Sequence, residues 1–355
     1  ALALLLGFEH PADAVLSRFF RDNRALGQRE RAFVAETAYA VLRRRRLLER
    51  LLGAEASPRL LVLAALVKLF GVSRRQLEQA LGEKELQWVA RFKGRQAGAL
   101  TPAEQADFPD WLAERLLAQM TPAEFLDLAQ GLNRPAPLDL RVNPLKAGRE
   151  AVLAQLNAEG IAAAAGRFSP LAIRLQAKPA LQKHPLYLDG AIEVQDEGSQ
   201  LLGYLLAPRR GEMVADFCAG AGGKTLLLGA LMRSSGRLYA FDVSDRRLGR
   251  LKARVARAGL SNVHPVAIAG ENDARIKRLA GKFDRVLVDA PCSGLGTLRR
   301  NPDLKWRQTP QDVAELARKQ RDILAAAARL VKPGGRLVYA TCSILAEENE
   351  AVVAA

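Results

Sequence analysis

Hydrophobic and polar positions change their spacing along the chain, and the change separates three stretches. In residues 12–90, apolar positions recur every three or four residues, which predicts helices over Ala32–Leu52 and Arg59–Phe70 with a glycine and a Ser-Pro pair between them. The residues in this stretch are mainly Leu, Ala and Arg. We therefore expect an all-α domain over residues 1–100.

Prolines become frequent in residues 101–195, where they bracket short helices and then two strand-like pieces. The two pieces are Leu138–Val142 and Leu171–Leu175. This pattern favours linker helices followed by a small α+β subdomain over residues 101–195.

After Gln195 short apolar runs alternate with helical patterns. Strands are predicted at Met213–Phe217, Arg237–Phe241, Val263–Ala269, Arg285–Val288 and Arg336–Ala340, and helices at Thr225–Met232, Ser244–Ala258 and Gln311–Val331. Such alternation produces βαβ crossovers and a mostly parallel sheet, so residues 196–355 are predicted to form an α/β, Rossmann-like domain. Ligands of these sheets bind at the carboxyl ends of the strands.

Composition excludes several classes of protein. The 355 residues are 49% apolar and 26% charged, as in a globular chain of two or three domains. No apolar run approaches the roughly 18 residues of a membrane span, so we expect a cytoplasmic protein without a membrane partner. Three cysteines and three histidines show no zinc-ligand spacing, so we expect no metal.

The net charge of +15 favours a polyanionic partner, with nucleic acid first. Residues 1–100 carry +8, residues 101–195 carry −2, and residues 196–355 carry +9. The Arg43–Arg46 run spans a full helical turn, so its side chains cannot all face one core. Either the run is a solvated face or it contacts phosphates.

A glycine-rich turn at residues 216–225 follows a predicted strand and opens a predicted helix. It lacks the glycine spacing of a P-loop and that of a dinucleotide-binding fingerprint. Asp216 lies just inside the preceding predicted strand, and Asp242 stands at the end of the next one, 20 residues after Gly222, as a ribose-binding carboxylate does. The pattern favours a nucleoside cofactor without a pyrophosphate; the alternative is a tight turn with a capping aspartate.

Two cysteines follow two further strand ends. Cys292 lies in Asp-Ala-Pro-Cys and Cys342 in Thr-Cys-Ser. A lone cysteine in such a place is more often an apolar filler, but neighbouring strand ends share one crevice, so both thiols are expected in the same pocket. The residues after Cys292 are expected to offer cations to a phosphate backbone and an aromatic face to a base, through Arg299, Arg300, Lys305 and Trp306.

These motifs stand in the order found in the Sun (NSUN) family of RNA cytosine-5 methyltransferases, which the chain resembles over residues 190–353. The resemblance rests on the glycine turn, on Asp289–Trp306, on the Thr-Cys-Ser of residues 341–343 and on the Glu-Asn-Glu of residues 348–350. Several separated motifs in family order make it specific.

Two further segments are similar to parts of the same family. Asn143–Gln195 and the following junction resemble its small RNA-recognition-like subdomain, and Arg31–Leu48 is similar to the NusB-like helical domain of the bacterial 16S rRNA member. Gly220-Ala221 stands where the family has Ala-Pro, which should leave the turn looser. The family continues with more strands after the last motif, so C-terminal strands are expected to be missing.

The resemblance implies transfer of a methyl group from S-adenosylmethionine to carbon 5 of cytosine through a covalent cysteine adduct. It implies that Cys342 is the nucleophile, that Cys292 helps to release the product, and that Asp289 binds the N3 edge of the base. The residues alone do not distinguish the two cysteines. Lys224 is a candidate for lowering a thiol pKa or stabilising charge on the ring, or else it is an ordinary lysine at a helix start.

The resemblance also implies which residues hold the cofactor. Asp242 is expected on the ribose hydroxyls, Asp273 on the adenine edge with Glu271 as its alternative, and Asp289 beside them. The turn backbone is expected to wrap the methionine end through Cys218, Ala219, Gly220, Ala221, Gly222, Gly223 and Lys224.

The leading hypothesis is therefore an S-adenosylmethionine-dependent RNA methyltransferase acting on 16S rRNA. The same reaction on tRNA is a second hypothesis. A third is a non-catalytic RNA-binding assembly factor with a methyltransferase fold, against which both cysteines, Asp289 and the glycine turn argue. The sequence determines neither the target nucleotide nor the oligomeric state.

Overall fold

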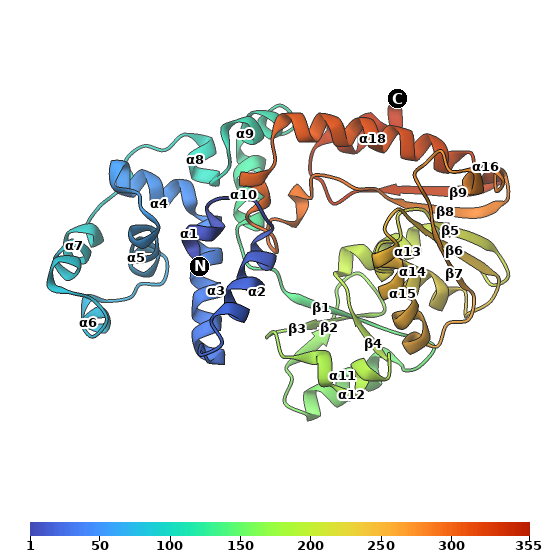
Figure 1. Ribbon diagram of the computed structural model, residues 1–355, viewed down its shortest axis with the longest axis horizontal. Helices are drawn as coiled ribbons and strands as arrows, with labels where there is room; N and C mark the ends of the chain where they lie inside the picture. Colours follow the sequence, from blue (N-terminus) through green and yellow to red (C-terminus); the bar gives the residue numbers. More distant parts are fainter. The chain divides into compact units, whose positions relative to one another are not determined.

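A computed structural model describes residues 1–355, which form two compact units, each assembled from separate stretches of chain (Figure 1). Unit 1 comprises Ala1–Pro135, Ser293–Ala314 and Cys342–Ala346, and unit 2 comprises Ala136–Cys292, Glu315–Thr341 and Glu347–Ala355. The division into three consecutive domains that the sequence predicts stays a prediction.

Unit 1 is helical. Its helices are α1 (Leu2–Leu5), α2 (Ala12–Asp22), α3 (Gln28–Arg43), α4 (Arg45–Leu52), α5 (Pro58–Lys68), α6 (Arg74–Leu77), α7 (Glu83–Lys93), α8 (Pro102–Ala106), α9 (Asp110–Leu117), α10 (Pro122–Leu132) and α17 (Leu304–Arg307), with the 3-10 turns η1 (Gly53–Glu55) and η3 (Leu295–Thr297). Ser-Pro and Thr-Pro pairs begin α5, α8 and α10, where the hydroxyl accepts a backbone N–H and the proline occupies the first turn.

One helix predicted over Ala32–Leu52 is two helices in the structure. The backbone leaves the helical region at Arg44, with φ −113° and ψ 28°, and α4 continues from Arg45. The apolar spacing is similar on both sides of the break, which is why the sequence did not indicate it.

The Arg43–Arg46 run makes contacts within unit 1. Arg44 Nε lies 3.1 Å from the fully buried carboxylate of Asp107. Arg46 Nη1 donates to the Phe108 carbonyl at 2.8 Å and lies 2.7 Å from Asp110 Oδ1, while Arg43 donates to the Arg299 carbonyl at 3.1 Å. The structure thus gives the run an internal role, because it joins α3 and α4 to α9 and to the segment that follows Cys292.

Lys305 is fully buried in the same region, so the prediction that its charge faces RNA is wrong. Its Nζ donates to the Arg43 carbonyl and to Asn133 Oδ1, both at 2.9 Å, and lies over the rings of Phe108 and Trp306. Burial lowers the pKa of Lys305 to about 7. The half-buried Trp306 donates its indole N–H to the Leu42 carbonyl.

Unit 2 begins with a small antiparallel sheet of order β2-β3-β1-β4, formed by β1 (Leu138–Val142), β2 (Ala163–Ala165), β3 (Ala172–Leu175) and β4 (Ile192–Val194). Alternate side chains of the sheet pack in one apolar cluster with α11 (Arg149–Ala158), and the 3-10 turn η2 (Leu181–Lys183) and α12 (Pro185–Leu188) contribute to it. The intervening positions include the polar residues Asp139, Arg141, Arg174 and Glu193.

The second sheet is parallel throughout, with order β7-β6-β5-β8-β9. Its strands are β5 (Met213–Asp216), β6 (Arg237–Asp242), β7 (Val263–Ala267), β8 (Phe283–Asp289) and β9 (Val331–Ala340). The helices between and around the strands are α13 (Glu197–Leu206), α14 (Gly223–Leu231), α15 (Asp245–Ala258), α16 (Ala274–Lys277) and α18 (Pro310–Ala328). The 3-10 turn η4 (Ala346–Glu348) and the helix α19 (Glu350–Ala354) follow β9.

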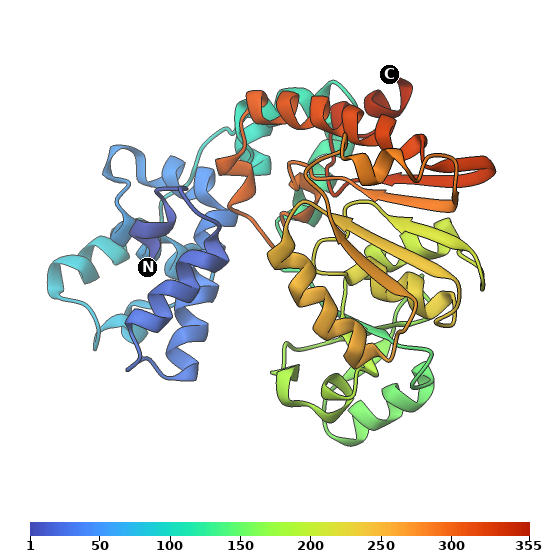
Figure 2. The same ribbon diagram turned by 45° about the vertical axis from the view of Figure 1, so that its right-hand side comes forward.

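Helices cover both faces of this sheet (Figure 2). Each face has its own cluster of buried apolar side chains. Leu206 of α13 and Leu228 of α14 pack on one face against Leu238 and Leu287. Ile323 of α18 packs on the other face in a cluster of buried residues that includes Ile276 of α16, Phe241, Phe283 and Val286. The predicted α/β, Rossmann-like fold is confirmed.

The last strand begins earlier than predicted. The sequence predicts a strand from Arg336, but β9 begins at Val331 and includes Lys332-Pro333-Gly334-Gly335 as an irregularity between the pairs Phe283–Val331 and Arg285–Arg336. None of the helices combines the length and apolar character that crossing a bilayer requires.

The buried Lys305 predicts a pH-dependent stability. Its pKa is about 7 in the folded chain and 10.5 ordinarily, so between these values the unfolded chain binds a proton that the folded chain lacks, and stability rises with pH. We expect the free energy of unfolding of the wild type, relative to Lys305→Met, to increase from pH 7 to pH 10 in urea titrations. Lys319 is exposed, so the free energy of unfolding of Lys319→Met should follow that of the wild type from pH 7 to pH 10. The same pH dependence in Lys305→Met and in the wild type would contradict the lowered pKa of Lys305.

Candidate functional site

Three aspartates end three adjacent strands at one edge of the parallel sheet. Asp242 ends β6, Asp216 ends the central strand β5, and Asp289 ends β8. Carboxylates placed so close disfavour one another's ionisation. The loops that follow these strands contain most of the residues that the sequence predicted for the site.

Asp216 is buried beneath the glycine turn. Its Oδ2 accepts the hydroxyl of Thr225 at 2.7 Å, whereas its Oδ1 is buried without a partner. Burial and the nearby Asp289 and Asp242 carboxylates raise the pKa of Asp216 to about 6. An orphaned oxygen at this position leaves room for a donor from a ligand.

The glycine turn itself needs glycine at two places. Gly220 has φ +57° and Gly222 has φ +89°, both in the left-handed region. A Cβ on Gly222 would stand 2.1 Å from Leu251 Cδ1 of α15, so the turn also lies tightly against that helix. The Gly220 N–H donates to Asp242 Oδ2 at 2.8 Å, which joins the turn to the end of β6.

Asp242 is buried and has its own donors. Its Oδ1 accepts the Ser244 N–H at 2.7 Å and lies 3.3 Å from Arg247 Nη2. Val243, which follows it, is 59% exposed. The strand end therefore places a fixed carboxylate next to an apolar side chain that faces solvent, a combination that suits a nucleoside.

Asp273 is held by its own segment. As the cap of α16 it accepts the N–H groups of Ala269 at 2.9 Å and Arg275 at 2.8 Å, and it pairs with the Arg275 guanidinium, which holds the pKa of this carboxyl far below its ordinary value. Both oxygens are thus engaged within the chain. Contact of Asp273, or of its half-buried alternative Glu271, with an adenine stays a prediction.

Lys224 and Asp289 join two of the predicted loops. Lys224 Nζ lies 2.5 Å from Asp289 Oδ2, so the first turn of α14 contacts the end of β8. Asp289 remains about one third exposed and can still reach a ligand. Cys218 is different, because burial and the neighbouring carboxylates raise the pKa of its thiol to about 12, which favours the protonated thiol over the thiolate.

The segments that follow Cys292 and Cys342 meet in unit 1. The hydroxyls of Ser293 and Ser343 lie 3.3 Å apart, and the Gly296 N–H donates to the Cys342 carbonyl at 2.8 Å. Cys292 is half-buried and Cys342 is exposed. In unit 2, β8 and β9 are paired up to Asp289 and Ala340, three and two residues before the respective cysteines.

Two residues of this region were missed as site residues by the sequence analysis. Gln320 of α18 donates to the Pro291 carbonyl at 2.9 Å and to Glu348 Oε1 at 3.0 Å, so it connects the residue before Cys292 with the segment after Cys342. Both Gln320 and Glu348 are fully buried. A polar residue within the apolar spacing of a long helix was the available signal for Gln320. No His, Cys, Asp and Glu side chains gather in a group that could hold a metal ion.

Several known proteins are similar to this chain over much of its length. Residues 203–355 match the family described as 16S rRNA methyltransferase RsmB/F, and residues 108–182 match its ferredoxin-like domain. The methyltransferase homolog protein of Pyrococcus horikoshii, known from a crystal structure, is 32% identical, with a TM-score of 0.63 and coverage of 71% of this chain and 79% of its own. The chain belongs to the RsmB/F family.

Other relatives of this RsmB/F family member are similar over much of its length. The ribosomal RNA small subunit methyltransferase B of Sodalis glossinidius (strain morsitans) is 40% identical over 271 residues, which are 75% of this chain and 62% of that protein. The crystal structure of the protein PH0851 has 28% identity and a TM-score of 0.79, over 99% of this chain and 86% of that one. The chain thus spans less than two thirds of the length of its curated relative.

The bridge made by Gln320 predicts a loss of stability on its removal from this RsmB/F domain. Gln320→Leu has a similar volume but removes the hydrogen bonds to the Pro291 carbonyl and to the buried Glu348 carboxylate, which should cost about 1–3 kcal/mol of unfolding free energy in urea titrations. The neighbouring Lys319→Leu, on the exposed face of α18, should stay within about 0.5 kcal/mol. Equal losses in the two variants would contradict the bridge.

Proposed function

We propose that this chain transfers the methyl group of S-adenosylmethionine to carbon 5 of a cytosine in RNA, with 16S rRNA as the substrate. Membership of the RsmB/F family and the names of its relatives support an rRNA substrate. The net charge of +15 is in keeping with a polyanionic partner.

The three aspartates at the sheet edge are the observation that best supports S-adenosylmethionine as the cofactor. Asp216, Asp242 and Asp289 are balanced locally by Lys224 and Arg247, which leaves the edge negative. S-adenosylmethionine carries a sulfonium and an ammonium group against one carboxylate, so its net positive charge suits such an edge, whereas a polyphosphate nucleotide would be repelled.

The residues present fit that cofactor. The orphaned Asp216 Oδ1 lacks a donor, and the N–H groups of the first turn of α14 have no acceptor inside the helix and suit a carboxylate. Asp242 would accept the ribose hydroxyls beside the exposed Val243. When bound, S-adenosylmethionine supplies an electrophilic methyl group.

The two cysteines support covalent activation of the base, because carbon 5 of cytosine is a weak nucleophile. The Cys342 thiolate would add to carbon 6, forming an S–C6 bond and moving an electron pair of the ring to carbon 5. Carbon 5 would then take the methyl group as the methyl–sulfonium bond breaks, with S-adenosylhomocysteine as the leaving group. Loss of the proton on carbon 5 and departure of the thiolate restore the 5,6 double bond, a step in which Cys292 would assist. Asp289 would bind the N3 edge of the base, held in place by Lys224.

Asp242 supplies a test of the cofactor site. Asp242→Ala removes charge-assisted hydrogen bonds to the ribose, each worth about 1.5–3 kcal/mol, so the Kd for S-adenosylmethionine should rise at least tenfold in titration calorimetry. Asp245→Ala, an exposed aspartate in the first turn of α15, is the matched control and should bind as the wild type does. Unchanged affinity of Asp242→Ala would remove that residue from the site.

The order of events separates the two cysteines. Cys342→Ala should abolish both methylation and any covalent adduct with RNA, whereas Cys292→Ala should accumulate a protein–RNA complex that survives denaturation, because the adduct forms but is not released. The readout is a band shift on a denaturing gel with 16S rRNA, which should vanish in the double variant. An adduct in Cys342→Ala would reverse the roles, and its absence from every variant would argue against covalent catalysis.

A further inference from the structure

Two arginines connect the small sheet of unit 2 to the glycine turn. Arg254 of α15 donates to the Ala221 carbonyl at 2.6 Å, and its second nitrogen donates to Glu193 Oε2 of β4 at 2.9 Å. The Glu193 side chain is 5% exposed and that of Arg254 is 23% exposed, so the carboxylate of this pair is buried while the guanidinium keeps some contact with solvent. One guanidinium thus bridges a carbonyl of the turn and a buried carboxylate of the small sheet.

The second arginine, Arg141, reaches the next part of the turn from β1. It lies directly opposite Glu193 in the sheet register, and it donates to the Gly223 carbonyl at 2.7 Å and to the side chain of Gln195. Arg141 is 2% exposed, and burial lowers its pKa to about 10, so it remains charged at neutral pH. A buried guanidinium requires acceptors, and the turn supplies one of them.

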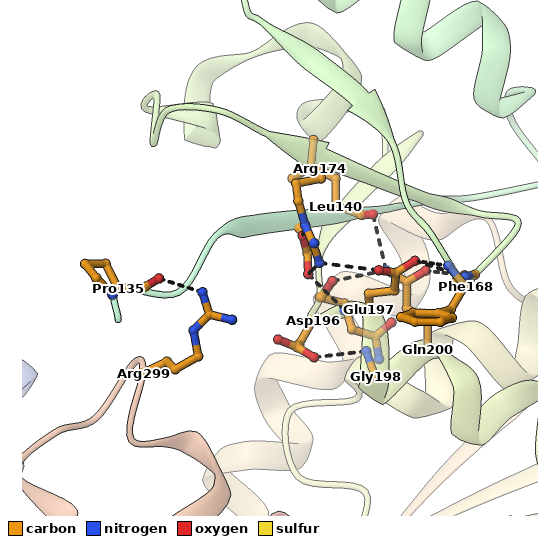
Figure 3. Close-up of polar contacts among 12 residues, drawn as sticks. Pro135, Leu140, Phe168, Arg174, Asp196, Glu197, Gly198, Gln200 and Arg299 are labelled. Carbon is orange, nitrogen blue, oxygen red and sulfur yellow. Dashed lines mark hydrogen bonds and ion pairs between the residues drawn. The ribbon is translucent and has the colours of Figure 1, made fainter. Parts of the chain in front are cut away.

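The small sheet can act as a fixed support because it is anchored to α13 (Figure 3). Glu197, the first residue of α13, accepts the N–H groups of Phe168 at 2.7 Å and Ser169 at 3.0 Å, and its other oxygen lies 3.3 Å from Arg174 of β3. Gln200 donates to the Leu140 carbonyl of β1 at 3.2 Å. The polar side of the sheet is therefore occupied within the chain.

The two contacted carbonyls belong to the part of the chain that would receive the cofactor. In a trans peptide the carbonyl and the next N–H point in opposite directions, so arginines on the Ala221 and Gly223 carbonyls leave the N–H groups of Gly222 and Lys224 on the far side. The Gly222 N–H closes the turn onto the Ala219 carbonyl at 2.9 Å, and the Lys224 N–H lies in the open first turn of α14. The small sheet thus holds the carbonyl groups on one side of the turn and leaves the opposite side to a ligand.

We propose that Arg254 and Arg141 are positioning residues, through which the small sheet holds the glycine turn in the conformation that binds the cofactor. The proposal rests on the function proposed above, because it takes S-adenosylmethionine as the ligand of the turn. It gives the RNA-recognition-like subdomain a role in cofactor affinity.

The chain contains a matched control for Arg254. Arg257 lies one helical turn further along α15, pairs with the other oxygen of Glu193 and is similarly exposed, at 20% against 23% for Arg254. It stacks on the Tyr187 ring at 4.0 Å and makes no hydrogen bond to the glycine turn. The two arginines thus differ in their contact with the turn while sharing their partner in the small sheet.

The experiment compares Arg254→Gln, Arg254→Lys and Arg257→Gln by calorimetry with S-adenosylmethionine and by thermal unfolding with and without it. Arg254→Gln should raise the Kd about tenfold, which corresponds to about 1.4 kcal/mol, and should reduce the ligand-induced rise in Tm. Arg254→Lys keeps the positive charge but cannot bridge two acceptors as a guanidinium does, so its Kd should lie between those of Arg254→Gln and the wild type. Arg257→Gln should lower the Tm of the free protein yet change the Kd less than twofold.

Each other outcome has a definite meaning. Wild-type affinity in Arg254→Gln, or an equal loss of affinity in Arg257→Gln, would overturn the positioning role while leaving the proposed function intact. A wild-type chain that does not bind S-adenosylmethionine would overturn both. Arg141→Lys provides a second test through β1, and an unchanged Kd in a folded Arg141→Lys would exclude that residue from the support.

Discussion

Three carboxylates at the end of three adjacent strands are the constraint on which the rest of this molecule depends. Parallel strands deliver Asp242, Asp216 and Asp289 to one edge, where mutual repulsion must be offset. The loops provide the offset in three ways, through backbone N–H groups on Asp242, through a hydroxyl and a raised pKa at Asp216, and through Lys224 on Asp289.

The two sides of the small sheet make different kinds of contact. One side packs apolar residues against α11 in a conventional core, whereas the polar side carries Arg141, Glu193 and Arg174 against the helices and turn of unit 2. The charged side chains of this polar face are paired within the chain, although the Arg174 side chain remains 45% exposed. These charges connect the small sheet to α13, to α15 and to the glycine turn, through carboxylates that are themselves buried.

Unit 1 illustrates how composition can mislead. A run of four arginines and the basic segment after Cys292 suggested phosphate contacts. In the structure the two segments donate hydrogen bonds to each other, from Arg43 to the Arg299 carbonyl and from Lys305 to the Arg43 carbonyl, and Lys305 also donates to Asn133. Carbonyl groups at helix ends need donors, and long cationic side chains can reach them from a distance. The cost of burying Lys305 appears in its lowered pKa.

Local patterns in the sequence determined the strands and helices of the parallel sheet, the glycine turn, and the positions of Asp216, Asp242 and Asp289, because spacing and turn chemistry act over short distances. The bounds of β5, β6 and α15 differ from the predicted ones by a single residue. Only the tertiary structure decided that Gln320 joins Pro291 to Glu348, that Lys305 is buried, and that Arg254 reaches the turn while Arg257 does not. These outcomes depend on contacts between residues tens to hundreds of positions apart, for which a single sequence carries no local signal.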